Sequence, residues 1–187
     1  NYVFKQNDEY YIVSTNKGTI TSVYATGKGV KVSPLKIGEN SSHIFEDTSI
    51  NPEPTVKTKG KTYKFEMSDE DLKTQTLIKY GDVYAQIYSD QQTNKILAVR
   101  FLDANTLATL QPYKLNRAED EGQISESSDD KIPHEQNPNQ LITLYEVTNK
   151  MREMKNLKSL KVNNDIARIA AINLYEATDK GSDSVEF

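Results

Sequence analysis

The chain of 187 residues carries a formal net charge of −4 and has a mean hydropathy of −0.70. That weak acidity disfavours a nucleic-acid-binding protein, which would gather lysine and arginine on one face. Because the chain has no cysteine and no apolar run of about 20 residues, a disulfide framework, a cysteine nucleophile and a membrane span within this segment are excluded.

Residues 1–113 predict an α+β fold, an antiparallel sheet with one or two short helices. The apolar segments 10–13 and 20–24 are typical of strands, and Gly18 between them supplies the positive φ of a tight hairpin turn. Farther on, the apolar spacing within 37–45 predicts a helix that begins near Asn40 or Ser41. Residues 48–61, which contain two prolines and a glycine, are predicted to form a loop.

Two parts of this region repeat a pattern. Residues 63–65 echo 2–4, and the Thr-Asn-Lys turn with its following strand at 93–101 echoes the one at 15–24. A tandem repeat would explain the echo, and so would the shared pattern of antiparallel hairpins.

An acidic segment follows at 114–139. It buries too little apolar surface to offset the entropy of ordering, so the sequence predicts a mobile linker. A calcium-binding loop is the alternative, although the spacing matches no EF-hand pattern. Its ligands would be Glu119, Asp120, Glu121, Asp129 and Asp130.

Residues 140–187 predict a helical pair. Apolar residues recur every three or four positions over 141–154 and again over 166–177, with a cap cluster at 163–165. These helices, which together span 140–178, present a long apolar stripe. We therefore expect them to pack on the N-terminal region or to associate with another copy of the chain.

The helical pair also carries short motifs in a fixed order. They are Asn149 and Arg152, Leu157 and Leu160, the cap at 163–165 and the alanine-rich segment 166–171. In this order they resemble the opening of the CAP superfamily in Gram-positive bacteria, a superfamily that includes cysteine-rich secretory proteins, antigen 5 and plant pathogenesis-related proteins. The resemblance implies the first helices of an incomplete αβα sandwich, whose remaining positions follow Phe187.

The matching residues suggest structural roles. Asn149 and Arg152 share a helix face and are expected to brace neighbouring carbonyls or carboxylates, with a solvated polar edge as the alternative. Leu157 and Leu160 are expected to be buried and so to anchor the turn in an apolar core. Many members carry, at the position of Asn173, a histidine of a cleft lined by two His and two Glu. An amide there is a weak zinc ligand and cannot be a general base near neutral pH.

The N-terminal region resembles the domain of unknown function that precedes CAP modules in secreted or surface proteins of Firmicutes. The residues that carry this resemblance are 10–18, 23–24, 34–38, 41–42, Ile44 and 80–101. The Asn- and Lys-rich composition suits a staphylococcal source. The resemblance implies an extracellular or cell-surface location, and we expect a removed signal or anchor before Asn1.

No catalytic, cofactor or metal residue is predicted, and no cofactor. The two histidines, His43 and His134, are isolated, which disfavours a zinc site and a Ser-His-Asp triad. The acidic groups at 69–71 and 129–130 are expected to be solvated surface rather than acid and base.

These observations favour a non-enzymatic secreted or cell-surface interaction module attached to a CAP domain. Its partner would be an extracellular protein, a glycan or a cell-wall component. An exposed aromatic patch would support this hypothesis, with Tyr10, Tyr24, Tyr84 and Tyr88 as its candidates. One alternative is that the chain forms a wall of the cleft of a CAP-type hydrolase or metal-binding protein. Another is that residues 1–113 serve as a folding partner or spacer for the CAP module.

Overall fold

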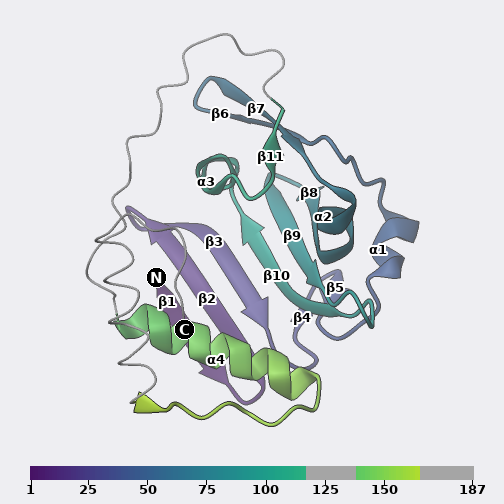
Figure 1. The fold of residues 1–187 in the computed structure, drawn as a ribbon. Helices are drawn as coiled ribbons and strands as arrows, with labels where there is room; N and C mark the ends of the chain where they lie inside the picture. The colour runs from purple at the N-terminus through teal and green to yellow at the C-terminus, as the bar shows by residue number, and fades with distance from the viewer. Residues whose placement is uncertain (117–137, 165–187) are drawn as a thin grey trace, which may run out of the picture.

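The computed structural model describes residues 1–116 and 138–164, and its largest element is a six-stranded sheet (Figure 1). The strand order is β1-β2-β3-β10-β9-β8, and every neighbouring pair is antiparallel. The strands are β1 (Tyr2–Gln6), β2 (Glu9–Asn16), β3 (Thr19–Thr26), β8 (Gln75–Tyr80), β9 (Val83–Ser89) and β10 (Ile96–Leu102). The predicted α+β class with an antiparallel sheet is confirmed.

The predicted hairpin at the start of the chain is present as β2 and β3. Lys17 and Gly18 form its turn with φ values of 50° and 80°, and Asn16 pairs with Thr19 across it. Two successive positive φ angles give a turn whose twist matches that of the flanking strands. Glycine at the second position is therefore the residue that the local geometry favours.

The sheet consists of two three-stranded meanders, β1–β3 and β8–β10, joined where β3 pairs with β10. The Thr-Asn-Lys sequences at 15–17 and 93–95 connect the second and third strands of their meanders. They therefore occupy equivalent places in the two halves. Residues 63–65 and 2–4, which resemble each other in sequence, are not equivalent in the structure. The place that β1 has in the first meander is taken by β8 in the second, whereas 63–65 lie in β7 of another sheet.

A second sheet of three strands occupies part of the segment that the sequence predicts to be a loop. Its order is β11-β7-β6, from β6 (Thr55–Thr58), β7 (Lys61–Glu66) and β11 (Lys114–Leu115). Lys59 and Gly60, both with positive φ, close the β6–β7 hairpin. The loop prediction failed because β6 offers a single buried apolar residue, Val56. β11 also shows that 114–115, assigned to the linker, pair with β7.

Three short helices lie within residues 1–113, one more than the upper limit predicted: α1 (Ser42–Asp47), α2 (Asp69–Thr74) and α3 (Ala104–Leu110). In α1 the N-cap is Ser41, as predicted, but its side chain makes no capping bond. Helix α2 begins with a capping box in which Ser68 and Asp71 bond to each other's backbone N–H. Asp103 caps α3 by accepting from the N–H of Thr106 at 2.7 Å. These polar caps fix where the short helices begin.

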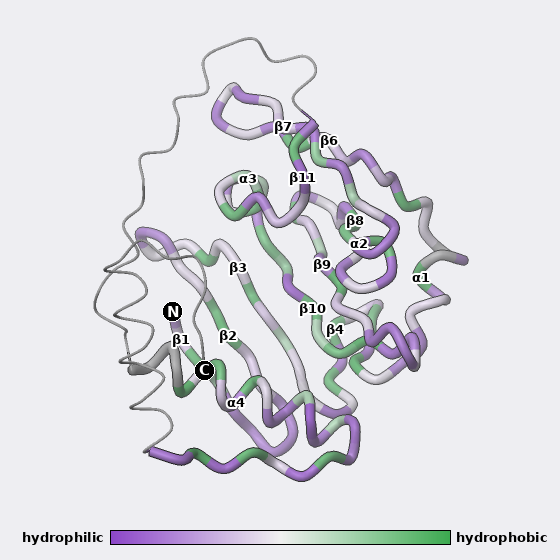
Figure 2. The backbone as a smooth tube through the Cα atoms, in the orientation of Figure 1, coloured by the Kyte–Doolittle hydropathy of each residue, from purple (hydrophilic) through white to green (hydrophobic). Residues whose placement is uncertain are grey.

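The two faces of the large sheet support separate cores. One face packs against α3 and the β6–β7 hairpin, and its core contains Val56, Phe65, Met67, Leu77, Tyr84, Leu102, Leu107 and Tyr113. The opposite face packs against α1 and the hairpin of β4 (Lys31–Val32) and β5 (Leu35–Lys36). Its core contains Ala25, Val30, Ile37, Ile44, Ile78, Ala85, Ile87, Ile96 and Val99. Figure 2 shows hydrophobic residues along β2 and β10 and hydrophilic ones around α2.

Gly27 is required where β3 ends beside the β1–β2 turn. Its φ is +119°, and a Cβ at this position would lie 1.8 Å from the carbonyl oxygen of Asp8. No side chain fits at that distance from a backbone atom, so this glycine permits the close approach of the two segments.

Candidate docking site for the C-terminal helix

Helix α4 (Pro138–Met154) lies across the β1–β3 half of the sheet (Figure 1). Near its middle, Glu146 accepts a hydrogen bond of 2.8 Å from the hydroxyl of Tyr10. The ammonium of Lys5 forms an ion pair with the same carboxylate. Tyr10 is fully buried on β2 and Lys5 lies on β1, so one helical carboxylate is held by two neighbouring strands.

The ionisation of these groups follows from their surroundings. Burial, together with the hydrogen bond to Glu146 and its negative charge, raises the pKa of Tyr10 above its ordinary value. The hydrogen bond from Lys5 lowers the pKa of Glu146, and the bond from Tyr10 adds to this effect. Near neutral pH the contact therefore joins a neutral phenol, a carboxylate and an ammonium group.

A second polar contact lies just beyond the C-terminal end of α4. Lys155 donates to Asp90 at 2.6 Å, and Asp90 is buried, with 8% of its surface exposed. The hydroxyl of Thr93 donates to the other carboxylate oxygen at 2.7 Å. The bonds from Lys155 and Thr93 lower the pKa of Asp90. Thr93 begins the second Thr-Asn-Lys sequence, so this turn positions the carboxylate that receives Lys155.

Met154 contributes the apolar part of the docking contact. Its side chain packs against the core that contains Ala25 and Val99, and its sulfur lies 3.8 Å from the hydroxyl oxygen of Thr26 on β3. A methionine fits such a site well because its flexible, polarisable side chain fills irregular gaps.

Asn149 and Arg152 hold the segment that follows α4. The side-chain amide of Asn149 accepts from the backbone N–H of Leu160 at 2.7 Å and donates to its carbonyl at 3.2 Å. The hydroxyl of Tyr145 donates to the same carbonyl at 2.7 Å. Arg152 donates through Nε to the carbonyl of Lys158 at 2.9 Å. These side chains thus bond to main-chain groups of the segment 155–163.

The expectation that Leu157 and Leu160 plug a core is wrong for the residues that the structure describes. They are 48% and 44% exposed, and Val162 beside them is 59% exposed. The segment is held by the polar clamp of Asn149 and Arg152, not by apolar burial. Sequence reasoning missed this because it took the two leucines of this turn as core residues.

Several predicted positions lie outside the described residues: Asn173, His134, the acidic groups at 119–121 and 129–130, and the second helix at 166–177. His43 is exposed and lies 3.3 Å from Glu46. The acidic run at 69–71 is the first turn of α2, where Asp71 completes the capping box. Within 1–116 and 138–164, no group of three or more His, Cys, Asp or Glu is placed to hold a metal ion.

The proposed aromatic patch is not formed by the residues that the sequence suggested. Tyr10, Tyr24 and Tyr84 are buried, and Tyr88 is half-buried. They lie on the sheet face that packs against α3 and α4, because registered residues and those two positions away share a face. The aromatic side chains that are exposed include Tyr2, Phe4 and Tyr80.

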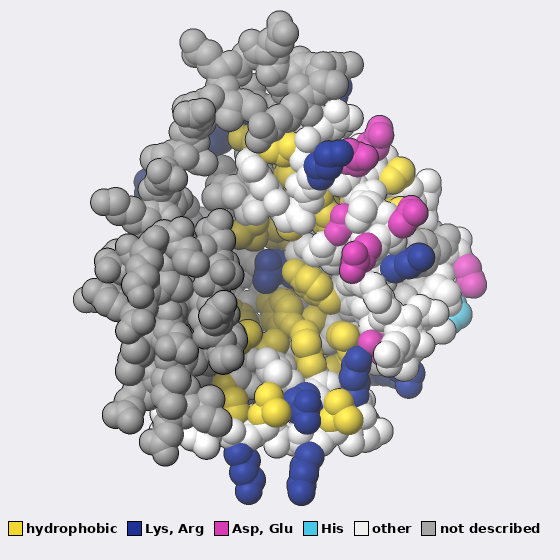
Figure 3. All heavy atoms as spheres, viewed as in Figure 1, with side chains coloured by type: hydrophobic (Ala, Val, Ile, Leu, Met, Phe, Trp, Pro, Cys, Tyr) yellow, Lys and Arg dark blue, Asp and Glu magenta, His cyan; other side chains and the backbone are white. Residues whose placement is uncertain are grey.

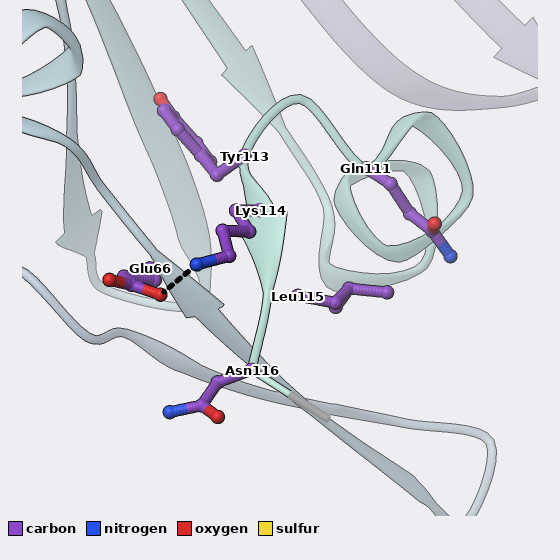
Figure 4. A pocket seen from close by; sticks show the side chains of 6 residues that line it. All are labelled: Glu66, Gln111, Tyr113, Lys114, Leu115 and Asn116. Atoms are coloured by element: carbon purple, nitrogen blue, oxygen red, sulfur yellow. Dashed lines mark ion pairs between the residues drawn. The ribbon is translucent and has the colours of Figure 1, made fainter. Parts of the chain in front are cut away.

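A surface depression of about 520 Å³ lies between β11, β7 and the end of α3 (Figure 4). It is lined by Glu66, Gln111, Tyr113, Lys114, Leu115 and Asn116. Lys114 pairs with Glu66 at 3.2 Å, and the hydroxyl of Tyr113 donates to the carbonyl of Gln75. Its polar groups do not converge on a common point in Figure 4, so the docking site is the stronger candidate for function.

Comparison with known proteins shows the family to which the chain belongs. Residues 1–113 match the model of the family described as CAP-associated N-terminal. The chain belongs to this family. A related bacterial protein is the uncharacterized membrane protein YlbC of Bacillus subtilis strain 168, which is 32% identical over 115 residues, covering 61% of this chain and 33% of that protein.

Two solved structures share the fold. A cysteine-rich secretory protein from Staphylococcus aureus subsp. aureus Mu50 is 60% identical with a TM-score of 0.84, covering 98% of this chain and 61% of that one. An extracellular protein containing a SCP domain from Bacillus anthracis strain Ames is 25% identical with a TM-score of 0.80, covering 97% and 59%. The suggested relationship to CAP-superfamily proteins of Gram-positive bacteria is confirmed. The chain spans about a third of the curated relative and about three fifths of each solved structure.

No helix in the described ranges combines the length and apolar character needed to cross a membrane.

Proposed function

We propose that residues 1–113 form a non-enzymatic docking domain that holds the first helix of a CAP domain in a fixed position. The observation that carries this proposal is a pair of separate polar contacts, Glu146 of α4 with Lys5 and Tyr10, and Lys155, the residue after α4, with Asp90. One contact near the middle of the helix and one just after its end restrict both its position and its direction. The partner in this proposal is therefore the CAP module of the same chain.

The chemistry of the contacts supports positioning. Exposed ion pairs contribute about 0–1 kcal/mol each, so they specify geometry more than they stabilise. Asp90 is buried, and leaving its carboxylate without Lys155 would carry a desolvation penalty. The two contacts thus favour one placement of α4 on the sheet.

We also propose that the protein is secreted or attached to the cell surface. Support comes from the descriptions of the two solved structures as secretory and extracellular, while the Bacillus subtilis relative is described as a membrane protein. Protease treatment of intact cells, followed by detection of residues 1–113, tests this location. Protection of the domain in intact cells and its loss after lysis would contradict it.

The docking proposal is tested by hydrogen exchange in Lys155→Gln. We expect the α4 amides to exchange about tenfold faster, because local opening becomes easier when a docking contact is lost. Lys150→Gln is the matched control: it removes a nearby lysine within α4, where Lys150 forms an ion pair with Glu153 of the same helix at 3.0 Å. A charge swap, Asp90→Lys with Lys155→Asp, should restore part of the protection. Equal exchange rates in the Lys155 and Lys150 variants would overturn the proposal.

A further inference from the structure

Arg100 lies on a central strand of the sheet, next to two tyrosine rings. It is on β10, where it pairs with Tyr24 of β3 on one side and with Gln86 of β9 on the other. Its guanidinium carbon is 5.8 Å from the ring centre of Tyr24 and 5.9 Å from that of Tyr88. The two ring centres are 6.1 Å apart. The three side chains thus form one compact group, which we call the Arg100 cluster.

The charge of Arg100 has no acidic partner among the described residues. The ion pairs found there use other cations, such as Lys5, Lys114 and Lys155. Arg100 is half-buried, so part of its hydration is lost. Stacking on aromatic faces offsets some of that loss, but the five N–H donors of a guanidinium lie in its plane and are not used by stacking. The guanidinium therefore retains N–H groups that can donate hydrogen bonds to an anion.

The cluster is held in place before any ligand arrives. The hydroxyl of Tyr88 donates to the buried side chain of Gln86 at 2.7 Å. Tyr24 is 8% exposed and packs against the Tyr88 ring. Both rings are thus fixed by the sheet, and little side-chain entropy remains to be lost on binding.

The face that carries the cluster is open to solvent in part. Figure 3 shows this side of the molecule hollowed over β3 and β10, with hydrophobic side chains and a basic one inside the hollow. The lining is therefore mainly apolar with a cation, which is the usual composition of a small-molecule site.

We propose that the Arg100 cluster binds the carboxylate of a small molecule that carries an apolar or aromatic group. The planar guanidinium matches a carboxylate through two parallel hydrogen bonds. The tyrosine rings and the hydrophobic hollow accommodate the apolar part. A singly charged carboxylate loses less hydration in a half-buried site than a phosphate dianion does. None of the contacts that dock α4 uses Arg100, so this site is independent of the docking function.

The test is a titration of the 187-residue protein with sodium benzoate at constant ionic strength, followed by NMR. We expect saturable shifts of the Arg100 Nε–H signal and of the Tyr24 and Tyr88 amides. Benzamide, which has the same ring without the charge, should give none of these shifts. Arg100→Gln should weaken benzoate binding by at least about tenfold. Lys79→Gln, which removes an exposed charge from the same sheet face, should change it by less than about twofold.

Equal binding of benzamide, or unchanged benzoate binding in Arg100→Gln, would overturn the proposal, as would the absence of saturable shifts. A measurement on the wild-type protein covers the case in which Arg100→Gln fails to fold. Phenylglyoxal modifies accessible arginines, and benzoate should slow its reaction at Arg100 several-fold. Arg152, which donates to the carbonyl of Lys158, is the internal reference and should react at an unchanged rate. Equal rates at Arg100 with and without benzoate would contradict carboxylate binding.

Discussion

The two halves of the six-stranded sheet share one strand plan but are covered in different ways. Over β8–β10, the residues Leu77, Tyr84 and Leu102 are buried in an apolar core beneath Phe65 and Leu107. Over β1–β3, on the same face, the cover is α4, which Glu146 joins to β1 and β2 and which Lys155, just past its end, joins to Asp90 in the β9–β10 connection. One cover is part of the core, whereas the other is a helix placed largely by polar contacts.

This difference indicates that one half of the sheet mainly stabilises the fold and that the other mainly sets the position of α4. Apolar burial contributes about 25 cal/mol per Å² and is not directional, so it stabilises the β8–β10 half strongly. Hydrogen bonds and ion pairs depend on geometry and contribute little net energy, so they select the position of α4 over β1–β3. We therefore expect α4 to open locally at a lower free energy than the rest of the fold.

The largest expected effect lies in the apolar half. Leu107→Ala should lower the free energy of unfolding by about 3 kcal/mol, because Leu107 is fully buried and its loss leaves a cavity. Leu110→Ala, on the same helix at 52% exposure, should cost less than about 0.5 kcal/mol. Urea unfolding of both variants measures the difference. Similar losses would mean that α3 is not the apolar cover described above.

A smaller effect is expected in the docked half. Tyr10→Phe removes the hydroxyl that donates to Glu146 and should weaken the docking of α4 by about 1 kcal/mol. The loss should appear in the hydrogen exchange of α4 and leave the amides of β8–β10 unchanged. Tyr11→Phe is the control, since its hydroxyl contacts Glu9 on its own strand at 3.2 Å. If Tyr11→Phe loosens α4 as much as Tyr10→Phe, the Glu146 contact does not hold the helix.

The smallest expected effect near neutral pH is that of the protonation of Glu146 and Asp90 on the docking of α4. The folded-state pKa values of Glu146 and Asp90 are lowered, so their contribution is fully present above the unfolded values of about 4 and is lost as pH falls through the folded values. Helix α4 should therefore loosen in acid before the apolar half unfolds. NMR signals of α4 and of β9, followed from neutral pH into acid, compare the two halves. Asp90→Asn should flatten the response of α4, and simultaneous loss of both sets of signals would refute the separation.

The sequence predicted the local features well. Gly18 marked the β2–β3 turn, and the Thr-Asn-Lys sequences marked equivalent connections in the two meanders. It failed at β6, where prolines and glycine suggested a loop although Val56 points into a core. It failed also for Leu157 and Leu160, because the leucine pattern of a helix or turn does not reveal which side has a partner.

The docking site and the Arg100 cluster could not be found from the sequence. Tyr10 and Glu146 are separated by 136 positions, and Lys155 and Asp90 by 65. No periodicity links such residues, because their meeting depends on strand order, on register and on where the helix lies. The tyrosines were candidates for an exposed patch, and only the pairing of β3 with β10 shows that Tyr24 lies next to Arg100.

By itself, then, the sequence determined the turns, several strands, the family resemblance and the motif Asn149 with Arg152, because these depend on neighbours along the chain. The tertiary structure alone decided which face each strand buries, which carboxylate receives Lys155 and which rings lie next to Arg100. These depend on the pairing of β3 with β10, which joins the two meanders across more than seventy residues. Packing between distant segments sets the burial and the local dielectric, and these decide what a tyrosine or an arginine can do.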